Sequence, residues 1–416
     1  MVSLLALSAC SWGTGAAGQK IASFEKVNLN QVKYVVEAGT DASDQRQKRG
    51  SVLIFINKDQ SVSLLEKADM YGQTFSWNKD SIFFADKDYD YFWDGEKLEK
   101  RAAPKANYID GLVTLEDGRS RVAAYNAGSK DRSDYREEIS LADQKASLLG
   151  ITNRPMAITS ACGNAAYGIS LNRGPEGNAY LALNQLLQNQ KPDPKVVAKS
   201  SLAGEETLLY SPSSPCINGQ IAFLSVQDFP DDQNSQSASR IPSVEAPIVK
   251  SERPLEDYQQ EQSDRKHKYV STLELWDTKT FEHRIIPLTD LQGEPLALES
   301  EAVAMAYYSE ASADSKELTW LAGTGQIMKT NLETGRTTQV GEGISKSEPG
   351  QSHWVVADFG YRIITVLDQD LENQKLTLYQ FDRKTGDQVQ KEDLSFVSQY
   401  LDGNKTIGGI SVPPTD

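Results

Sequence analysis

The chain has 416 residues, which is long enough to bury a sizeable core. Its 43 Lys and Arg against 58 Asp and Glu give a formal net charge of −15. This balance argues against nucleic acid as a partner, because nucleic-acid binding leaves a basic footprint. The sequence contains no run of about 20 apolar residues, so no transmembrane helix is predicted.

The chain starts with an apolar segment closed by small residues, Leu7-Ser8-Ala9-Cys10. This stretch resembles the lipobox of bacterial lipoproteins, which implies cleavage before Cys10 and a lipid on its sulfur. Residues 1–10 are then the end of a signal that starts upstream, and the glycine-rich residues 11–23 form a flexible tether. The alternative is a buried strand with a chance cysteine. The resemblance predicts an extracytoplasmic protein attached to the bacterial cell membrane by its N-terminal lipid alone.

Short β-branched and aromatic runs recur between turn signals, whereas helical periodicity is nearly absent. The longest helix candidate, 178–190, lacks a cap and a sustained 3.6-residue period. The pattern predicts an all-β sandwich, barrel or propeller. The runs that indicate strands include 51–56, 81–85, 89–93, 120–125, 220–226, 270–276, 317–322, 362–366 and 375–381.

A repeated turn favours the propeller over the sandwich and the barrel. A strand ends in Asp277, Asn331 or Asp382 and a polar turn follows, at intervals of 54 and 51 residues. Four weaker copies are centred on Asn57, Asp94, Asp143 and Asn184. Repeats of this length with four short strands are typical of β-propeller blades. We therefore predict seven four-stranded blades over 24–416, with six or eight blades, or two unrelated β domains, as alternatives.

Two copies of the turn contain a Trp-Asp pair, Trp93-Asp94 and Trp276-Asp277. These pairs resemble the WD dipeptide of WD40 repeats, and the architecture resembles WD40 and PQQ-type propellers in general. The last apolar run, 406–412, is predicted to close the ring by pairing with the first blade.

Cys162 and Cys216 each precede an apolar run, at equivalent positions of neighbouring repeats. Exported proteins meet an oxidising environment, so we predict a disulfide between them, with two separate buried thiols as the alternative. The chain has no C-x-x-C motif, and its three histidines stand in unrelated places. No zinc-type metal site is therefore predicted.

An acidic insertion at about 227–268 interrupts one repeat and contains proline, serine and glutamine in place of apolar runs. Such a segment buries little, so we predict a disordered loop. It is either a solvated loop or an arm that recognises a partner.

Motifs for chemistry are scarce. No phosphate-binding loop and no nucleophile elbow occur, so no catalytic residue and no cofactor are predicted. Asp86, Asp88 and Asp90 alternate as at the start of a calcium loop. The sixth and twelfth positions, Tyr91 and Lys97, depart from the EF-hand pattern, so these carboxylates are a weak metal candidate or simply an exposed hairpin tip.

These observations predict a lipid-anchored propeller that acts as a non-enzymatic scaffold for a protein partner in the cell envelope, without nucleic acid. The alternatives are a module that senses a small ligand or ion, and a hydrolase or lyase acting on carbohydrate. The ligand-binding residues, the binding face and the oligomeric state stay open at this level.

Overall fold

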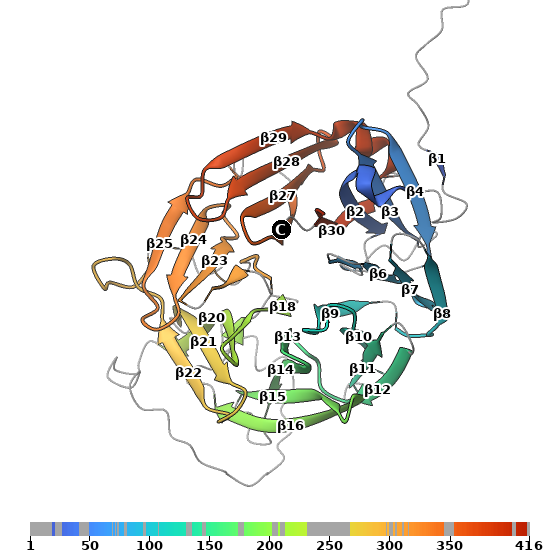
Figure 1. Ribbon diagram of the computed structural model, residues 1–416. Coiled ribbons are helices and arrows are strands. Elements are labelled where there is room, and N and C mark those ends of the chain that lie inside the picture. Colours follow the sequence, from blue (N-terminus) through green and yellow to red (C-terminus); the bar gives the residue numbers. More distant parts are fainter. Residues whose placement is uncertain are drawn as a thin grey trace, which may run out of the picture.

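The short apolar runs form seven antiparallel sheets around a central axis (Figure 1). The computed structural model describes residues 19–20, 27–40, 50–68, 70, 72, 75–78, 81–94, 97–106, 108–129, 135–143, 147–173, 179–201, 207–208, 213–230, 267–296, 298, 303, 306–309, 312–314, 316–344, 353–401 and 405–413. Each sheet is one blade, and its strands follow one another outward from the axis. The predicted seven-bladed all-β propeller is confirmed.

The first four blades have four strands each, together with short additional strands at the edges. From the axis outward, blade 1 is β30 (Lys405–Ser411), β2 (Val32–Thr40), β3 (Ser51–Asn57) and β4 (Val62–Lys67), blade 2 is β5 (Phe75–Trp77), β6 (Ile82–Ala85), β7 (Tyr89–Trp93) and β8 (Leu98–Ala102), blade 3 is β9 (Ile109–Thr114), β10 (Arg121–Ser129), β11 (Tyr135–Ala142) and β12 (Ser147–Thr152), and blade 4 is β13 (Ile158–Cys162), β14 (Ala165–Arg173), β15 (Ala179–Gln188) and β16 (Lys191–Ser201). The edge strands β1 (Gln19–Lys20) and β18 (Ser213–Ser214) pair in parallel with β4 and β13. The helix candidate at 178–190 is thus a strand, and β1 lies within the predicted tether.

The last three blades are less regular at the axis. Blade 5 has β17 (Thr207–Leu208) and β19 (Cys216–Ile217) inside β20 (Gln220–Pro230), β21 (His267–Asp277) and β22 (His283–Pro287), blade 6 is β23 (Glu317–Leu321), β24 (Ile327–Asn331) and β25 (Thr337–Gly341), and blade 7 is β26 (His353–Phe359), β27 (Ile363–Asp370), β28 (Lys375–Asp382) and β29 (Gln388–Asp393). In blade 6 a single antiparallel bridge between Tyr307 and Leu321 occupies the inner position. The described residues also form two short 3-10 helices, η2 (Leu29–Gln31) and η5 (Ser395–Tyr400).

The two ends of the chain close the ring. Strand β30 pairs antiparallel with β2, with Ile410 opposite Val36. Trp354 of blade 7 also donates its indole N–H to the carbonyl of Ile407, at 2.6 Å. The prediction that the last apolar run pairs with the first blade is confirmed.

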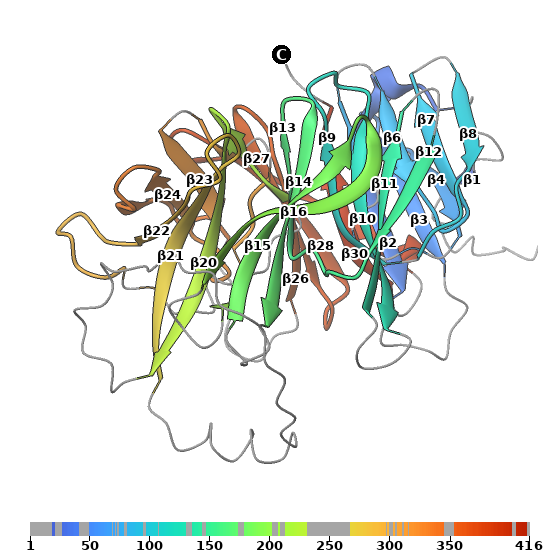
Figure 2. The same ribbon diagram turned by 90° about the horizontal axis from the view of Figure 1, so that it is seen from below.

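Alternating strand directions give the ring two different faces. The turns between first and second and between third and fourth strands lie on one side, here called the turn face. The hairpins between second and third strands and the linkers between blades lie on the other, here called the hairpin face. Figure 2 shows the C-terminus on the turn face, whereas the far ends of the paired strands β20 and β21 reach out on the hairpin face.

The repeated turns join third to fourth strands. In each, the carboxylate or amide oxygen of the first residue accepts two backbone N–H groups, from residues 279 and 280 at Asp277, from 333 and 334 at Asn331, and from 384 and 385 at Asp382. One weaker copy was wrong: Asn184 lies inside β15, where it donates to Gly168 and Ser170. The turn of that blade is at residues 189–190, which both have positive φ.

The core is divided among the interfaces between blades. Between blades 1 and 2, Leu53 and Phe55 pack against Phe75, Ile82 and Phe84, all fully buried. Each such side chain contributes about 1.5–3 kcal/mol through removal of apolar surface from water.

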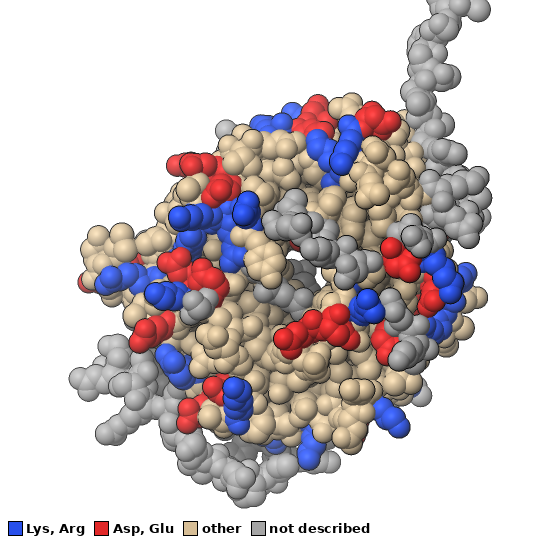
Figure 3. Space-filling view, viewed as in Figure 1, with Lys and Arg blue, Asp and Glu red and all other residues tan. Residues whose placement is uncertain are grey.

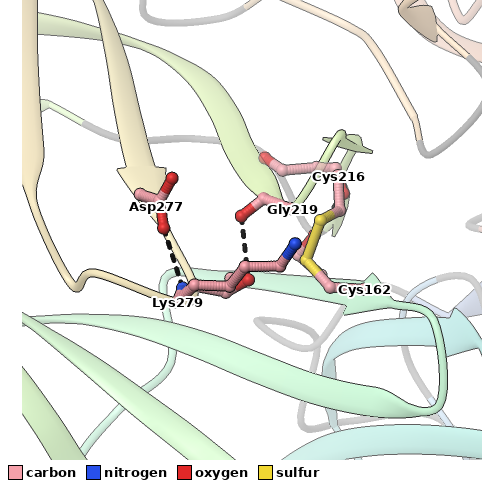
Figure 4. The surroundings of a disulfide bond; sticks show 8 residues. Cys162, Cys216, Gly219, Asp277 and Lys279 are labelled. Atoms are coloured by element: carbon pink, nitrogen blue, oxygen red, sulfur yellow. Dashed lines mark hydrogen bonds between the residues drawn. A yellow bond between two sulfur atoms is a disulfide. The ribbon is translucent and has the colours of Figure 1, made fainter.

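The predicted disulfide is confirmed, and it joins neighbouring blades. Cys162 ends β13 in blade 4, Cys216 lies in β19 in blade 5, and their Cα atoms are 5.3 Å apart. Figure 4 shows this bond beside the turn where Thr278 donates to the carbonyl of Gly219. The bond therefore fixes two inner strands at the turn face.

The insertion was predicted at about 227–268, and both of its ends belong to strands. Strands β20 and β21 pair as far as Pro230 and His267, so 227–230 and 267–268 belong to the blade. Residues 231–266 lie outside the described part of the chain, as do 1–18.

Candidate functional site

Charged side chains are buried where blades 1, 2 and 3 meet at the hairpin face. Glu37 on β2 is 1% exposed, and its Oε1 lies 2.5 Å from Nζ of Lys67 at the end of β4. Lys105, in the linker after β8, lies 3.0 Å from Oδ1 of Asp90 on β7, and both side chains are almost fully buried. Removing two ion pairs from water costs free energy. Their position at one edge of the ring therefore indicates that this edge has a function besides packing.

Backbone groups and an aromatic ring hold the Lys105 ammonium in place. It donates to the carbonyls of Asp86, at 2.9 Å, and Tyr89, at 3.3 Å. It also lies 5.7 Å from the ring centre of Tyr125, which is fully buried. Burial, and next the charge of Asp90, raise the pKa of the Tyr125 phenol well above 10, so it stays protonated.

A second group of side chains lies beside the first, on blade 3. Burial raises the pKa of Asp110, on β9, to about 6, although the neighbouring Asn126 amide and Tyr135 phenol oppose the shift. Burial, and next the charge of Asp110, raise the pKa of Glu137, on β11, to about 8. Glu137 accepts the backbone N–H of Met156 at 2.7 Å, and its other oxygen has no hydrogen-bond partner in the described part of the chain. One carboxyl of this pair thus changes its protonation near neutral pH.

A cleft of about 450 Å³ opens between blades 2 and 3 beside these groups. Lys105, Asn126 and Glu138 line it, together with Pro104, Ala106 and Ala127. Glu138 accepts the backbone N–H of Ala106 at 2.6 Å and so links the linker to β11. Asn126 connects the cleft to Asp110. A polar molecule in the cleft would therefore lie near a carboxyl that can give or take a proton.

The aspartates proposed from the sequence as a weak metal candidate do not point to one place. Asp86 accepts the backbone N–H groups of Asp88 and Tyr89 and the hydroxyl of Tyr91. Asp90 is buried beside Lys105. Among the described residues, no group of three or more His, Cys, Asp or Glu side chains could hold a metal ion.

The other predicted site residues are accounted for separately. Cys162 and Cys216 form the disulfide on the turn face, away from the cleft. Cys10, the predicted lipidation site, lies outside the described residues. No helix in the described part of the chain is long and apolar enough to cross a membrane.

Sequence reasoning missed Glu37, Asp110 and Glu137. Glu37 and Asp110 each interrupt an apolar strand, as in Val-Val-Glu-Ala at 35–38, whereas Glu137 stands between Arg136 and Glu138. A single acid inside an apolar run is the signal that could have found Glu37 and Asp110, because a buried charge needs a partner. The partners, however, lie on other strands, as Lys67 on β4 does for Glu37 and Asn126 on β10 does for Asp110, and no local pattern specifies them.

Comparisons with known proteins gave structures only. No family model matches the sequence, and no curated protein matches it. Among solved structures, cobalt-substituted apocarotenoid oxygenase from Synechocystis has 9% identity and a TM-score of 0.46, covering 94% of each chain. The β-propeller domain of the trilobed protease from Pyrococcus furiosus has 11% identity and a TM-score of 0.47, covering 91% of this chain and 96% of that one.

This finding corrects two predictions. The sequence analysis assigned a non-enzymatic scaffold, and no enzyme, because it found no catalytic motif. The similar structures include an oxygenase, so a propeller without a recognised motif is no ground for a non-enzymatic assignment. Both predictions were wrong.

The chain has three histidines, and histidine is the commonest protein ligand for transition metals. His283 bonds Glu274 and His353 bonds Asp368, in blades 5 and 7.

Proposed function

We propose that the protein is an enzyme of the cell envelope that acts by carboxyl acid–base chemistry at the cleft between blades 2 and 3. The observation that carries this proposal is the polar cleft, whose lining residue Asn126 connects it to the Asp110 carboxyl. Burial raises the pKa of Asp110 to about 6, which suits a group that gives and takes protons near neutral pH. Lys105 is neutralised by Asp90, so the accessible charge in the cleft is that of Glu138.

The lining suits a polar substrate rich in hydroxyl groups. Asn126 and Glu138 offer hydrogen-bonding groups, and Tyr108, which is 41% exposed, precedes Asp110 on the same edge. Aromatic faces and carboxylates together are a common way to hold a sugar ring. The reaction class proposed is hydrolysis or elimination on a glycan, with Asp110 as the proton-transfer group and Asn126 as its positioning residue.

A turnover assay tests the proposal. Purified protein is incubated with cell-envelope glycans and neutral oligosaccharides, and products are identified by mass spectrometry across pH 4 to 9. Product formation that changes with an apparent pKa near 6 and is lost in Asp110→Asn supports it. The matched control is Asp117→Asn, which removes a carboxylate from the turn face of the same blade. Activity unchanged in Asp110→Asn, or no turnover of any glycan, would contradict it.

The proposal includes the location of the protein in the cell. The lipobox-like stretch before Cys10 supports an N-terminal lipid that holds the propeller at the outer surface of the cell membrane. Mass spectrometry of the N-terminal peptide of the native protein tests this: a diacylglyceryl group on Cys10 supports it, and an unmodified cysteine overturns it.

A further inference from the structure

A second site lies on the turn face, at the junction of blades 6 and 7. It is independent of the cleft between blades 2 and 3. Its centre is Arg383, the second residue of the repeated turn in blade 7, which is only 8% exposed.

The same backbone contact fixes this position in three blades. The second turn residue donates its N–H to a carbonyl at the start of the neighbouring second strand: Thr278 to Gly219, Leu332 to Lys316, and Arg383 to Arg362. The three side chains therefore occupy equivalent places. This place is next to the core, where Leu332 packs against buried apolar residues.

The three equivalent side chains make different contacts. Thr278 donates its hydroxyl to the same carbonyl, and Leu332 needs no partner. Arg383 brings five N–H donors to this place, and no described side chain or carbonyl accepts a hydrogen bond from them. Its guanidinium nitrogens are not among the buried polar atoms that lack a hydrogen-bond partner, so they reach the surface, where an oxyanion would supply two acceptors in one plane.

The nearby carboxylates do not fill that role. Asp314 and Asp382 each accept two backbone N–H groups of their own turns. Asp314 acts on Arg383 only by its charge, without an ion pair.

The rim of the site suits an anionic ligand. Arg362 and Lys384 are exposed beside Arg383, and Tyr361 is 85% exposed. Figure 3 shows Lys and Arg side chains gathered over blades 6 and 7, next to the opening at the axis. An exposed tyrosine beside them offers a flat surface for the body of the ligand.

We propose that Arg383, with Arg362 and Lys384, forms a binding site for an oxyanion, the phosphate or carboxylate group of a small ligand. Arg383 binds the anion through two parallel N–H bonds, and the two exposed cations attract it. The site lies on the face opposite the cleft, so its ligand is not the substrate of the proposed reaction.

Calorimetric titration of the full chain with inorganic phosphate, and separately with succinate, at constant ionic strength tests the site. We expect saturable binding of at least one of them, and competition if both bind. Arg383→Leu should weaken this binding by about tenfold or more, since a charge-assisted pair is lost. Because Leu332 stands at the equivalent place in blade 6, this variant should fold, and circular dichroism checks that it does.

Arg336→Gln is the matched control, because it removes an exposed arginine at the end of the equivalent turn in blade 6. It should bind as the native protein does. No saturable binding of either anion, or equal binding by Arg383→Leu, would overturn the proposal. Because the glycan assay reports on the other face, its outcome is independent of this one.

Discussion

Lys105 and Asp90 form an ion pair that is almost entirely removed from water, with 3.0 Å between Nζ and Oδ1. The pair joins the linker after blade 2, which contains Lys105, to the start of β7 in the same blade, which contains Asp90. Because Lys105 also binds two backbone carbonyls, it fixes the wall of the cleft between blades 2 and 3. The shape of the cleft therefore depends on the charge of Lys105, which is compensated by Asp90 and not by water.

Replacing Lys105 by methionine should destabilise the protein by about 3–5 kcal/mol, because the Asp90 carboxylate is then buried alone. Urea unfolding measures the change. The double variant Lys105→Met, Asp90→Leu should recover most of the loss, since no unpaired charge remains. A double variant as unstable as the single one would show that packing, and not charge, holds this linker.

The half-exposed pair Lys33–Glu392, at 2.7 Å, is the control for that experiment. Lys33→Met should cost about 1 kcal/mol or less, because water screens the pair and already solvates its partner. Equal losses at Lys33 and Lys105 would mean that burial does not decide the value of these pairs.

The stability of the protein should fall as pH rises through neutrality because of Glu137. Its pKa is raised from 4.5 in the unfolded chain to about 8 in the fold. Between these values the folded state holds a proton that the unfolded state has released, so unfolding becomes easier as pH rises. The slope from one such group is at most about 1.4 kcal/mol per pH unit.

Glu137→Gln removes this titration and should flatten the dependence of unfolding free energy on pH between 5 and 8. The variant should equal or exceed the native protein in stability at pH 8. Glu333→Gln, an exposed site in the turn of blade 6, should leave the slope unchanged. A slope that persists in Glu137→Gln would mean that another group carries it, with Asp110, whose pKa is about 6, as the first to examine.

The fold could be predicted because its signals are local. Asp277, Asn331 and Asp382 repeat one turn chemistry, and their spacing equals one blade. Cys162 and Cys216 precede equivalent strands, which was enough to pair them. The error at Asn184 has the same origin, because a polar residue inside a long strand resembles a turn when only its neighbours are considered.

The cleft could not be predicted because its parts come from different strands and from the linker after blade 2. Asp90 appeared in the sequence as one of three alternating acids, and its actual partner, Lys105, follows one strand later. The pKa of Asp110 depends on burial and on Asn126 and Tyr135. None of these relationships leaves a fixed spacing in the sequence.

Removing the disulfide should destabilise the protein without opening the ring. The bond closes a loop of 54 residues, and loss of its constraint on the unfolded chain should cost about 4 kcal/mol. Cys162→Ser with Cys216→Ser, compared by urea unfolding with the native protein under oxidising and reducing conditions, measures this. The native protein should lose the same stability on reduction, and the variant should not respond to it. A variant as stable as the oxidised native protein would contradict the prediction.

Blades 6 and 7 approach each other so closely at one turn that only glycine fits. Gly386 has φ of +75°, and a Cβ there would collide with the backbone carbonyl of Val340 in β25. Gly386→Ala should therefore destabilise the protein by more than the about 1 kcal/mol of a left-handed alanine alone. Gly293 is the matched control, since its φ is +87° and nothing lies within 4 Å of the added methyl group. Chemical unfolding should give Gly293→Ala only the conformational loss and Gly386→Ala a clearly larger one. Because the contact is between backbone atoms, it cannot relax by a change of rotamer. Equal losses of stability at both sites would mean that the two blades can separate at this turn without cost.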